Sequence, residues 1–364
     1  MKSSPAGHSF SPLDLSARPD KVRSMLFDSQ ALVVADPSNV QWLTGFTGSN
    51  AIVYLDHERF VLLTDQRYQE QGPLEIREAQ SPAEISISKN LIEDVSKLAR
   101  TKVINLDANL VSWETVNQLR ERTGTELVSS SPLKTLRAQK DQFEVERISL
   151  AAKIADKALS DTIPLFSENV SEMDVAAFLD NKIRQHGASG NAYQTIVASG
   201  VNSSKPHALP TTRRIGQGDL LIVDVGAVVD GYRSDMTRTF VIGEPSKLQQ
   251  EYLTTVLEAQ EEAVRSLEPD MPCAELDRRC RSKIEEAGWG ESFIHGTGHG
   301  VGLDIHESPA INGRSEEKLM TGMVVTIEPG IYFTDTCGVR WEDLYEITET
   351  GARRLTLSAK SPQA

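Results

Sequence analysis

Two stretches in the second half of the chain share one pattern, and this repeat constrains the fold more than any other feature. Residues 218–226 read Gly-Asp-Leu-Leu-Ile-Val-Asp-Val-Gly, and residues 322–330 read Gly-Met-Val-Val-Thr-Ile-Glu-Pro-Gly. Each contains an apolar run typical of a buried strand, followed by a carboxylate and a glycine. We therefore predict two α/β halves related by pseudo-twofold symmetry. A chance alignment of two glycine-flanked strands is the alternative.

The carboxylates that end these strands, Asp224 and Glu328, need compensation. An ionised side chain at the end of a buried strand is costly unless a cation or hydrogen-bond donors accompany it. A single acid of this kind usually belongs to a structural ion pair. Here each acid is followed by a second one, Asp235 after the first strand and Glu342 after the second. Two acid pairs at the junction of two similar halves favour a shared metal site.

Histidines concentrate in one glycine-rich segment, residues 293–307. His295, His299 and His306 lie there, with glycines at every second position from 296 to 302. Such glycines disfavour a regular helix and let the backbone approach a ligand closely. A lone histidine is more often a packed core residue than a ligand, but three in one such segment favour function. His207 stands alone in its own segment.

Arg340 lies two residues before Glu342 in a run that reads as a strand, so the two side chains face the same side. A simple Arg–Glu ion pair would explain this spacing. An arginine that orients a substrate beside a metal-bound carboxylate is the other interpretation.

Four carboxylates and one imidazole (His299) form a hard, oxygen-rich donor set. Such a set favours Mn²⁺, Co²⁺, Zn²⁺ or Fe²⁺ over a thiolate site. Two ions about 3.5–4 Å apart bridge a water, lower its pKa and polarise a carbonyl group, which is the machinery of metal-assisted hydrolysis. The sequence contains no P-loop, no Gly-x-Gly-x-x-Gly after a strand and no Gly-x-Ser-x-Gly motif.

Composition narrows the class of protein. The net charge of −14 argues against a nucleic-acid partner, since duplex binding relies on clustered Lys and Arg. No apolar run is long enough to span a membrane, and residues 1–15 lack the apolar core of a secretory signal. Three cysteines without a pattern of short spacings fit a reducing compartment. We therefore predict a cytoplasmic protein without membrane contacts.

The first part of the chain predicts a separate α/β domain. Short apolar runs at 31–35, 51–55, 60–64 and 102–106 read as strands, and residues 67–71 and 91–99 read as helices. A polar stretch at 137–142 then leads into a long helix, so we place the domains at residues 1–137 and 138–364. Further helices are expected from Ser171 to Gly187, at 248–267 and at 273–287.

At these residues the chain resembles the pita-bread metallopeptidases, specifically the Xaa-Pro branch of aminopeptidase P and prolidase. The resemblance covers nearly the whole chain and implies a creatinase-like N-terminal α/β domain followed by a pita-bread catalytic domain. The motifs in the catalytic part are residues 223–227, 231–240, 295–302, 326–332 and 339–343, and those in the N-terminal part are 39–46 and 64–68. Trp341 departs from the family, which more often has an aliphatic residue there.

The resemblance implies a role for each metal ligand. Asp224 binds one ion in bidentate fashion, Asp235 and Glu342 bridge both ions, and His299 and Glu328 bind the other ion. Glu328 is also the family's usual candidate for the base that handles the bridging water. The cofactor is thus two divalent ions, with Mn²⁺ as the first choice.

The resemblance also assigns residues to the substrate. His207 and His306 hydrogen-bond the substrate and the tetrahedral intermediate. His295 and Arg340 shape the proline pocket, and Tyr332 is a further candidate for it. The short bacterial relatives in this branch are usually dimers, which implies a homodimer.

The implied activity is hydrolysis, by a metal-bridged hydroxide, of the bond between an N-terminal residue and a following proline. This is the Xaa-Pro aminopeptidase reaction, and Xaa-Pro dipeptidase (prolidase) is the alternative. Proline needs a dedicated pocket because its nitrogen carries no N–H for a peptidase to bind. A methionine aminopeptidase, a creatinase and a silent peptide-binding module are further alternatives. The N-terminal domain and the Arg340–Glu342 spacing argue against the first, and the complete ligand set argues against the other two.

Overall fold

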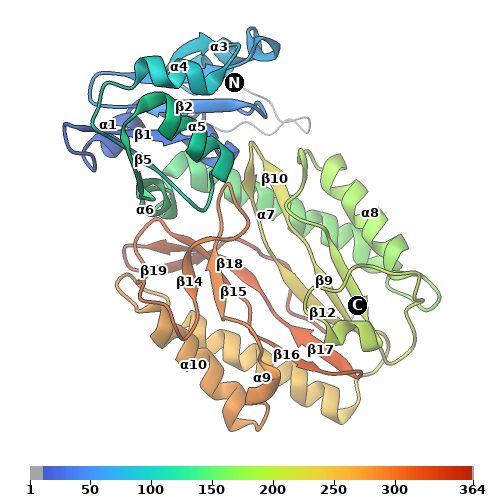
Figure 1. The fold of residues 1–364 in the computed structure, drawn as a ribbon. Helices are drawn as coiled ribbons and strands as arrows, with labels where there is room; N and C mark the ends of the chain where they lie inside the picture. The colour runs from blue at the N-terminus through green and yellow to red at the C-terminus, as the bar shows by residue number, and fades with distance from the viewer. Residues whose placement is uncertain (1–10, 363–364) are drawn as a thin grey trace. The chain divides into compact units, whose positions relative to one another are not determined.

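The computed structural model describes residues 11–362, which divide into two compact units, Ser11–Arg137 and the described part of 138–364 (Figure 1). The residues 1–10, on which the expected lack of a signal sequence largely depends, lie outside the described part. Across residues 11–362, none of the helices combines the length and the hydropathy needed to cross a bilayer.

The N-terminal unit is built on one six-stranded sheet in the order β4-β3-β2-β1-β5-β6. β1 pairs antiparallel with β2, and β2 with β3, whereas β1/β5, β5/β6 and β3/β4 are parallel. The strands are β1 (Gln30–Val34), β2 (Ala51–Leu55), β3 (Phe60–Thr64), β4 (Glu84–Ile87), β5 (Val103–Leu106) and β6 (Glu126–Ser129).

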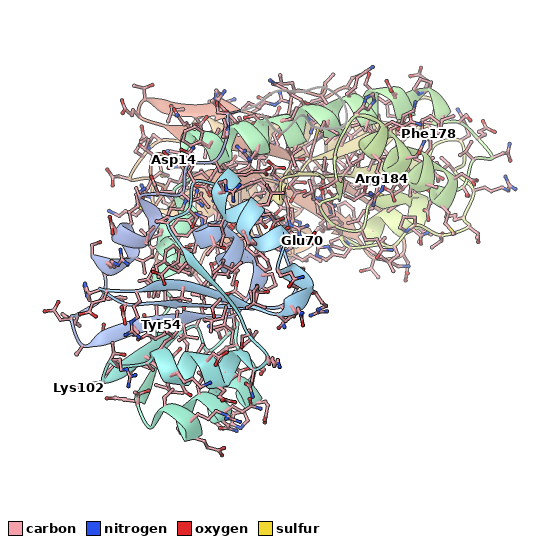
Figure 2. The ribbon with its side chains drawn as sticks, turned by 90° about the horizontal axis from the view of Figure 1, so that it is seen from above. Asp14, Tyr54, Glu70, Lys102, Phe178 and Arg184 are labelled. Carbon is pink, nitrogen blue, oxygen red and sulfur yellow. The ribbon has the colours of Figure 1, made fainter. Side chains whose placement is uncertain are left out.

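Helices accompany this sheet, and three of them begin at a capping side chain. Asp36, Asn90 and Ser112 accept hydrogen bonds from the first turns of α2, α4 and α5. The helices are α1 (Arg18–Arg23), α2 (Pro37–Thr44), α3 (Gln71–Glu78), α4 (Leu91–Leu98), α5 (Trp113–Thr123) and α6 (Pro132–Ala138). Figure 2 labels Tyr54, a fully buried residue of β2, and the exposed Glu70 and Lys102 of the same unit.

One helix prediction in this unit was wrong. Residues 67–71 were expected to be helical, but only a 3₁₀ turn, η1 (Gln66–Tyr68), forms there, and α3 starts at Gln71. The Asp65 side chain accepts a hydrogen bond from the Arg67 N–H, which caps this short turn. The capped 3₁₀ turn ends at Tyr68, so the α-helix begins later, at Gln71, than the residue pattern indicated.

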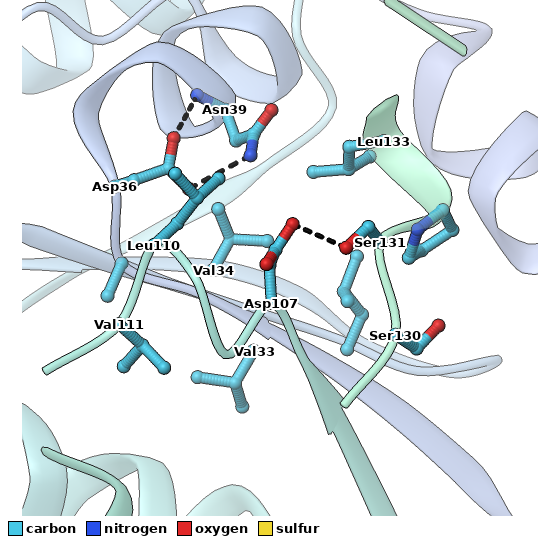
Figure 3. Close-up of a pocket in the computed structure, with 13 residues that line it drawn as sticks. Val33, Val34, Asp36, Asn39, Asp107, Leu110, Val111, Ser130, Ser131 and Leu133 are labelled. Atoms are coloured by element: carbon cyan, nitrogen blue, oxygen red, sulfur yellow. Dashed lines mark hydrogen bonds between the residues drawn. The ribbon is translucent and has the colours of Figure 1, made fainter. Parts of the chain in front are cut away.

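A small cavity of about 20 Å³ lies in this unit at the carboxyl ends of β1, β5 and β6 (Figure 3). It has room for about one water molecule. Its carboxylates already have donors: Ser131 Oγ lies 2.5 Å from Asp107, and Asn39 binds Asp36 through its backbone and side-chain nitrogens, each at 2.9 Å. The cavity is therefore a packing feature with satisfied polar groups.

The second unit consists of two halves, each with two helices packed on strands (Figure 1). The first half holds α7 (Gln142–Thr162), α8 (Glu172–Gln185), β7 (Gly190–Asn191), β8 (Ile196–Ser199), β9 (Leu220–Asp224), β10 (Ala227–Val229), β11 (Tyr232–Arg233) and β12 (Thr237–Val241). The second half holds α9 (Lys247–Val264), α10 (Cys273–Glu286), β13 (Gly298–Gly300), β14 (Glu307–Ile311), β15 (Val324–Ile327), β16 (Gly330–Phe333), β17 (Cys337–Arg340), β18 (Asp343–Thr348) and β19 (Gly351–Arg354). Short 3₁₀ helices are η2 (Ile163–Leu165), η3 (Gly200–Ser204) and η4 (Gly290–Ser292).

The halves repeat one strand pairing, as the sequence repeat predicted. In the first, β9 pairs antiparallel with β12, and Asp224 is opposite Thr237. In the second, β15 pairs antiparallel with β18, and Ile327 is opposite Asp343. Because an antiparallel partner starts where its neighbour ends, each half places its two acids at one end of a strand pair.

Helix predictions in this unit were confirmed within a few residues. Capping boxes at Asp141, Ser171 and Ser246 start α7, α8 and α9. Cys273 and Cys280 lie on α10, buried and without a disulfide, as small core side chains. Burial raises the pKa of these thiols to about 11 and about 12.

Candidate metal centre and active site

A cavity of about 510 Å³ in the second unit collects the residues singled out from the sequence. The metal-ligand candidates that line it are Asp224, Asp235, His299, Glu328 and Glu342. The candidates for substrate contact that line it are His207, His295, His306 and Arg340. Tyr332 does not line the cavity itself, but its hydroxyl contacts two of these residues.

Three of the candidate ligands lie close enough together to hold one ion, and Glu328 lies beside them. Ligand atoms of Asp235, His299 and Glu342 are all within 4.8 Å of one another. Glu328 Oε1 lies 3.4 Å from His299 Nε2, and Asp235 Oδ2 lies 3.6 Å from the same nitrogen. Since these residues come from both halves, the site forms only when the halves pack together.

The glycines around His299 are needed because strands crowd against the segment. A side chain at Gly298 would collide with the carbonyl oxygen of Thr326, and one at Gly300 with the carbonyl oxygen of Ser308. β13 is thus held close to its neighbours, and a register shift between His299 and Gly300 interrupts its pairing with β14. The close packing directs His299 toward the carboxylates.

The carboxylates in the cavity repel one another. Burial raises the pKa of Asp235 well above its usual range, and the charge of Asp224 adds to the shift. Burial likewise raises the pKa of Glu342, with contributions from Asp235 and Glu328. Both directions indicate that nearby cationic side chains do not balance this negative charge. An oxygen-rich, buried and under-compensated donor set with one imidazole fits divalent cations.

Arg340 binds across the two halves. Its guanidinium is buried and donates to Asp224 Oδ2 at 2.7 Å, to the Tyr332 hydroxyl at 2.7 Å and to Thr237 Oγ1 at 3.0 Å. The simple Arg–Glu pair considered from the sequence does not form, since the carboxylate that Arg340 binds is Asp224 of the other half. This bond fixes Asp224 and leaves Glu342 among the carboxylates of the cavity.

The histidines occupy different environments. His295 is half-buried between Gly296 O, 2.8 Å from Nδ1, and the Tyr332 hydroxyl, 3.1 Å from Nε2, and burial lowers its pKa. His306 packs edge-on against His299 with ring centroids 4.4 Å apart, and burial lowers its pKa as well. His207 and His306 line the cavity and are exposed.

Sequence reasoning missed two residues at the site. The Tyr193 hydroxyl lies between two carboxylates, 2.5 Å from Asp235 Oδ1 and in contact with Asp224 Oδ1. Thr237 Oγ1 donates to Glu342 Oε2 at 2.6 Å. A tyrosine between two short strands and a threonine that begins a strand carry no sequence signal for such contacts. The Tyr193 contacts come from the tertiary packing within the first half, and the Thr237 contact comes from the packing of the two halves.

Comparison with known proteins identifies the family. The sequence pattern of metallopeptidase family M24 matches residues 146–349, and that of the creatinase/prolidase N-terminal domain matches residues 28–139. The chain belongs to metallopeptidase family M24. As an M24 metallopeptidase it is a metal-dependent peptidase, and its donor set agrees with that chemistry.

Relatives of this M24 metallopeptidase extend along nearly its whole length. A Xaa-Pro dipeptidase from Pyrococcus furiosus is 38% identical over 327 residues, 89% of this chain and 92% of the relative. The structure of a Xaa-Pro dipeptidase from Bacillus anthracis superposes with a TM-score of 0.91 at 32% identity, covering 95% of this chain and 98% of that one. An X-Pro aminopeptidase from Thermotoga maritima MSB8 gives 0.86 at 32% identity, covering 94% and 99%.

These comparisons confirm the predicted fold class. The chain has a creatinase-type N-terminal domain and a pita-bread catalytic domain, as its structural neighbours do.

Proposed function

We propose that the chain hydrolyses the peptide bond between an N-terminal residue and a following proline, using two divalent ions held by Asp224, Asp235, His299, Glu328 and Glu342. The observation that carries the proposal is the convergence of these five side chains, from both halves, on one cavity. Relatives named for Xaa-Pro cleavage, aligned over most of the chain, support the substrate class.

The ions, when bound, lower the pKa of a water molecule and polarise the scissile carbonyl group. Glu328, on the cavity wall beside His299, accepts the proton of the attacking water and returns it to the proline nitrogen as the C–N bond breaks. His207 and His306 donate hydrogen bonds to the carbonyl oxygen, on which negative charge develops. Because both are exposed in the cavity, neither has to break a buried contact to do so.

The proline ring is held by shape, since its nitrogen offers no N–H. His295 and Arg340 line the cavity, and both contact the Tyr332 hydroxyl behind them, at 3.1 Å from His295 Nε2 and 2.7 Å from Arg340, so Tyr332 braces the two side chains into one rigid wall. A rigid wall suits proline because the ring is itself fixed in shape. We assign these three residues to the proline pocket.

The alternative is Xaa-Pro dipeptidase activity. Names of two relatives, the Xaa-Pro dipeptidases of Pyrococcus furiosus and Bacillus anthracis, favour it. The structural neighbour named an X-Pro aminopeptidase favours the first reading. The two activities share the metal site and the proline pocket and differ in the peptide length that the site accepts.

Three finer points belong to the same proposal. Mn²⁺ is proposed as the ion because carboxylate ligands outnumber the single imidazole. A cytoplasmic location is supported by three cysteines that form no disulfide. A homodimer is proposed from the resemblance to short bacterial relatives alone.

A paired assay tests the proposal. Chelator-treated protein is supplied with Mn²⁺ or left without it, and incubated with Ala-Pro and with Ala-Pro-Ala. Metal-dependent cleavage of Ala-Pro-Ala establishes the aminopeptidase, and cleavage of Ala-Pro alone establishes the dipeptidase. If neither peptide is cut with Mn²⁺, Co²⁺, Zn²⁺ or Fe²⁺, the proposed function fails and a silent peptide-binding module takes its place.

A further inference from the structure

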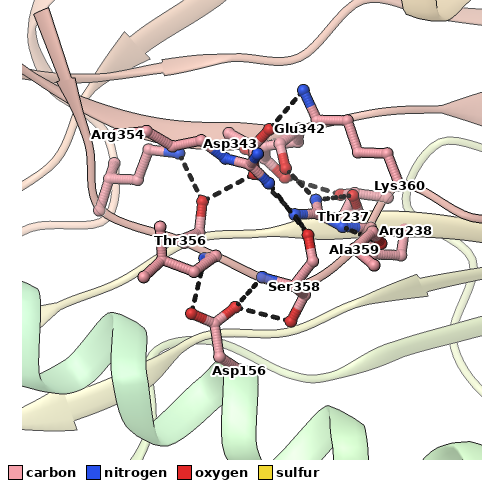
Figure 4. Close-up of polar contacts among 12 residues, drawn as sticks. Asp156, Thr237, Arg238, Glu342, Asp343, Arg354, Thr356, Ser358, Ala359 and Lys360 are labelled. Atoms are coloured by element: carbon pink, nitrogen blue, oxygen red, sulfur yellow. Dashed lines mark hydrogen bonds and ion pairs between the residues drawn. The ribbon is translucent and has the colours of Figure 1, made fainter.

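The last described stretch of the chain, residues 355–362, has no regular secondary structure but is held at several points (Figure 4). We call it the tail segment. On α7, the Asp156 carboxylate accepts hydrogen bonds from Leu357 N at 2.7 Å, Ser358 N at 2.8 Å and Ser358 Oγ at 2.6 Å. The Val241 N–H of β12 donates to Pro362 O at 2.7 Å. The tail segment is therefore docked on the first half.

The tail segment also reaches the second half through Asp343, a fully buried carboxylate at the start of β18. Three cations surround it: Arg238 at 2.6 Å, Lys360 at 2.7 Å and Arg354 at 2.9 Å. Lys360, from the tail segment, also donates to Gln260 Oε1 of α9 at 2.6 Å. The tail segment thus supplies one of the charges that allow Asp343 to be buried.

Arg238 connects this cluster to the proposed metal site. Its guanidinium is fully buried and donates hydrogen bonds to four main-chain oxygens, one from each half and two from the tail segment. They are Thr237 O at 2.8 Å, Glu342 O at 2.6 Å, Ser358 O at 2.8 Å and Ala359 O at 3.2 Å. Thr237 in turn donates through Oγ1 to the Glu342 carboxylate at 2.6 Å. Both the main chain and the carboxylate of Glu342 are therefore tied to residues that Arg238 holds.

We propose that the tail segment is a positioning element for the metal site, which fixes Glu342 through Arg238 and Asp343. The inference rests on the proposed metal site and assigns to it residues outside the cavity. Loss of the tail contacts leaves Arg238 without two of its acceptors and Asp343 without one cation. Glu342 then loses the fixed orientation that a shared metal ligand requires, although no ligand has been removed.

Two variants weaken these contacts from opposite ends without touching a proposed ligand. Lys360→Met removes one cation from Asp343, and Asp156→Ala releases the tail segment from α7. Lys360→Arg retains the charge and serves as the rescue variant. Asp161→Ala is the matched control, because Asp161 lies on the same helix with similar exposure and binds Lys157 and His186 instead of the tail segment.

The measurement is titration of each chelator-stripped, full-length variant with Mn²⁺ by calorimetry, beside thermal unfolding without metal. We expect Lys360→Met and Asp156→Ala to weaken Mn²⁺ binding about tenfold, the lower end of what loss of an outer contact to a metal ligand costs. Lys360→Arg and Asp161→Ala should bind Mn²⁺ as the unaltered chain does, even if Asp161→Ala unfolds at a lower temperature.

Mn²⁺ affinity within twofold of the unaltered chain in both Lys360→Met and Asp156→Ala would overturn the inference, whatever their stability. If Lys360→Met does not fold, Asp156→Ala decides the matter by the same criterion. Failure of the unaltered chain to bind Mn²⁺ would instead count against the proposed metal site. The two failures are therefore distinguishable.

Discussion

Glu342 and Asp343 are neighbours in the chain and both are buried, yet they belong to opposite environments. Burial raises the pKa of Glu342, and the nearby charges of Asp235 and Glu328 raise it further. Burial also acts to raise the pKa of Asp343, but Arg238, Lys360 and Arg354 outweigh it and hold that pKa below its usual value. Adjacent strand residues point to opposite sides, so Glu342 faces the carboxylates of the cavity and Asp343 faces the cation cluster.

The contrast shows what separates a structural acid from a candidate ligand. Burial alone does not decide it, because both side chains are buried. The sign of the surrounding charge does: Asp343 is balanced by the protein's own cations, whereas Asp235 and Glu342 lie among other carboxylates whose charges raise their pKa further. The Arg238 contacts join the two clusters, so each affects the other.

The largest expected effect comes from removing an acid on the cavity side. We expect Asp235→Ala to abolish peptide hydrolysis and binding of a second Mn²⁺. The Asp235 carboxylate lies 3.6 Å from His299 Nε2 and shares the Tyr193 hydroxyl with Asp224, so it connects the two proposed ligands. The folded structure should persist, since the change relieves repulsion among buried acids. Activity on Ala-Pro-Ala, Mn²⁺ stoichiometry and circular dichroism provide the check, and activity like that of the unaltered chain would sink the ligand assignment.

Removing Asp343, the acid that faces the cation cluster, should instead lower the stability of the fold. Asp343→Asn leaves Arg238, Lys360 and Arg354 without their counter-charge, and breaking a buried pair of this kind costs about 3–5 kcal/mol of unfolding free energy. Glu346→Gln on the same strand is the control, since its partner Arg353 is exposed and the expected loss is below about 1 kcal/mol. Urea denaturation of both variants measures the difference in unfolding free energy. Equal losses would show that Asp343 contributes no more to stability than Glu346 does.

Bound Mn²⁺ should stabilise the fold through the acids that line the cavity. Mn²⁺ at about 100 times its dissociation constant adds about 2.7 kcal/mol, which raises the melting temperature of a domain of this size by roughly 5–11 °C. The ions compensate acids that otherwise repel one another. Thermal unfolding with and without Mn²⁺ tests this, and the Asp235→Ala variant should show a smaller rise. An equal rise in that variant would place the bound ions elsewhere.

A smaller effect is expected at Tyr193, whose hydroxyl orients Asp224 and Asp235. Tyr193→Phe should weaken Mn²⁺ binding about tenfold, as is typical for loss of a partner that orients a ligand. The ring remains, so thermal stability without metal should change little. Calorimetric titration measures the affinity. Binding as tight as in the unaltered chain would mean that the hydroxyl only fills space between the two acids.

The smallest effect is expected in the N-terminal unit. Asp107 is bonded to Ser131 Oγ and to Asn109 N, at 2.5 and 2.9 Å. Asp107→Asn should cost about 0.5–1.5 kcal/mol, the usual net worth of a hydrogen bond, and leave Mn²⁺ binding and hydrolysis unchanged. Urea denaturation and the peptide assay test this. A loss of Mn²⁺ binding would show that acids outside the cavity also contribute to it.

Local pattern predicted much of the fold. Strand runs, capping residues and helical spacing depend on neighbours in the chain. For this reason α7–α10 and the corresponding strands of the two halves, β9 and β15, could be located in advance. The error at residues 67–71 arose because the Asp65 cap is a side-chain contact that the apolar pattern does not report.

The sequence by itself predicted that two similar halves would each bring an acid pair to a common junction, because each half repeats a local pattern of an apolar strand, a carboxylate and a second acid. It also located His299 and Arg340 near those acids. Only the tertiary structure decided that Arg340 binds Asp224 and that Tyr193 lies between two carboxylates. The same holds for Arg238, which ties the tail segment to Glu342. These contacts join residues far apart in the chain, and their geometry is set by tertiary packing, within the first half for Tyr193 and between the halves for Arg340 and Arg238.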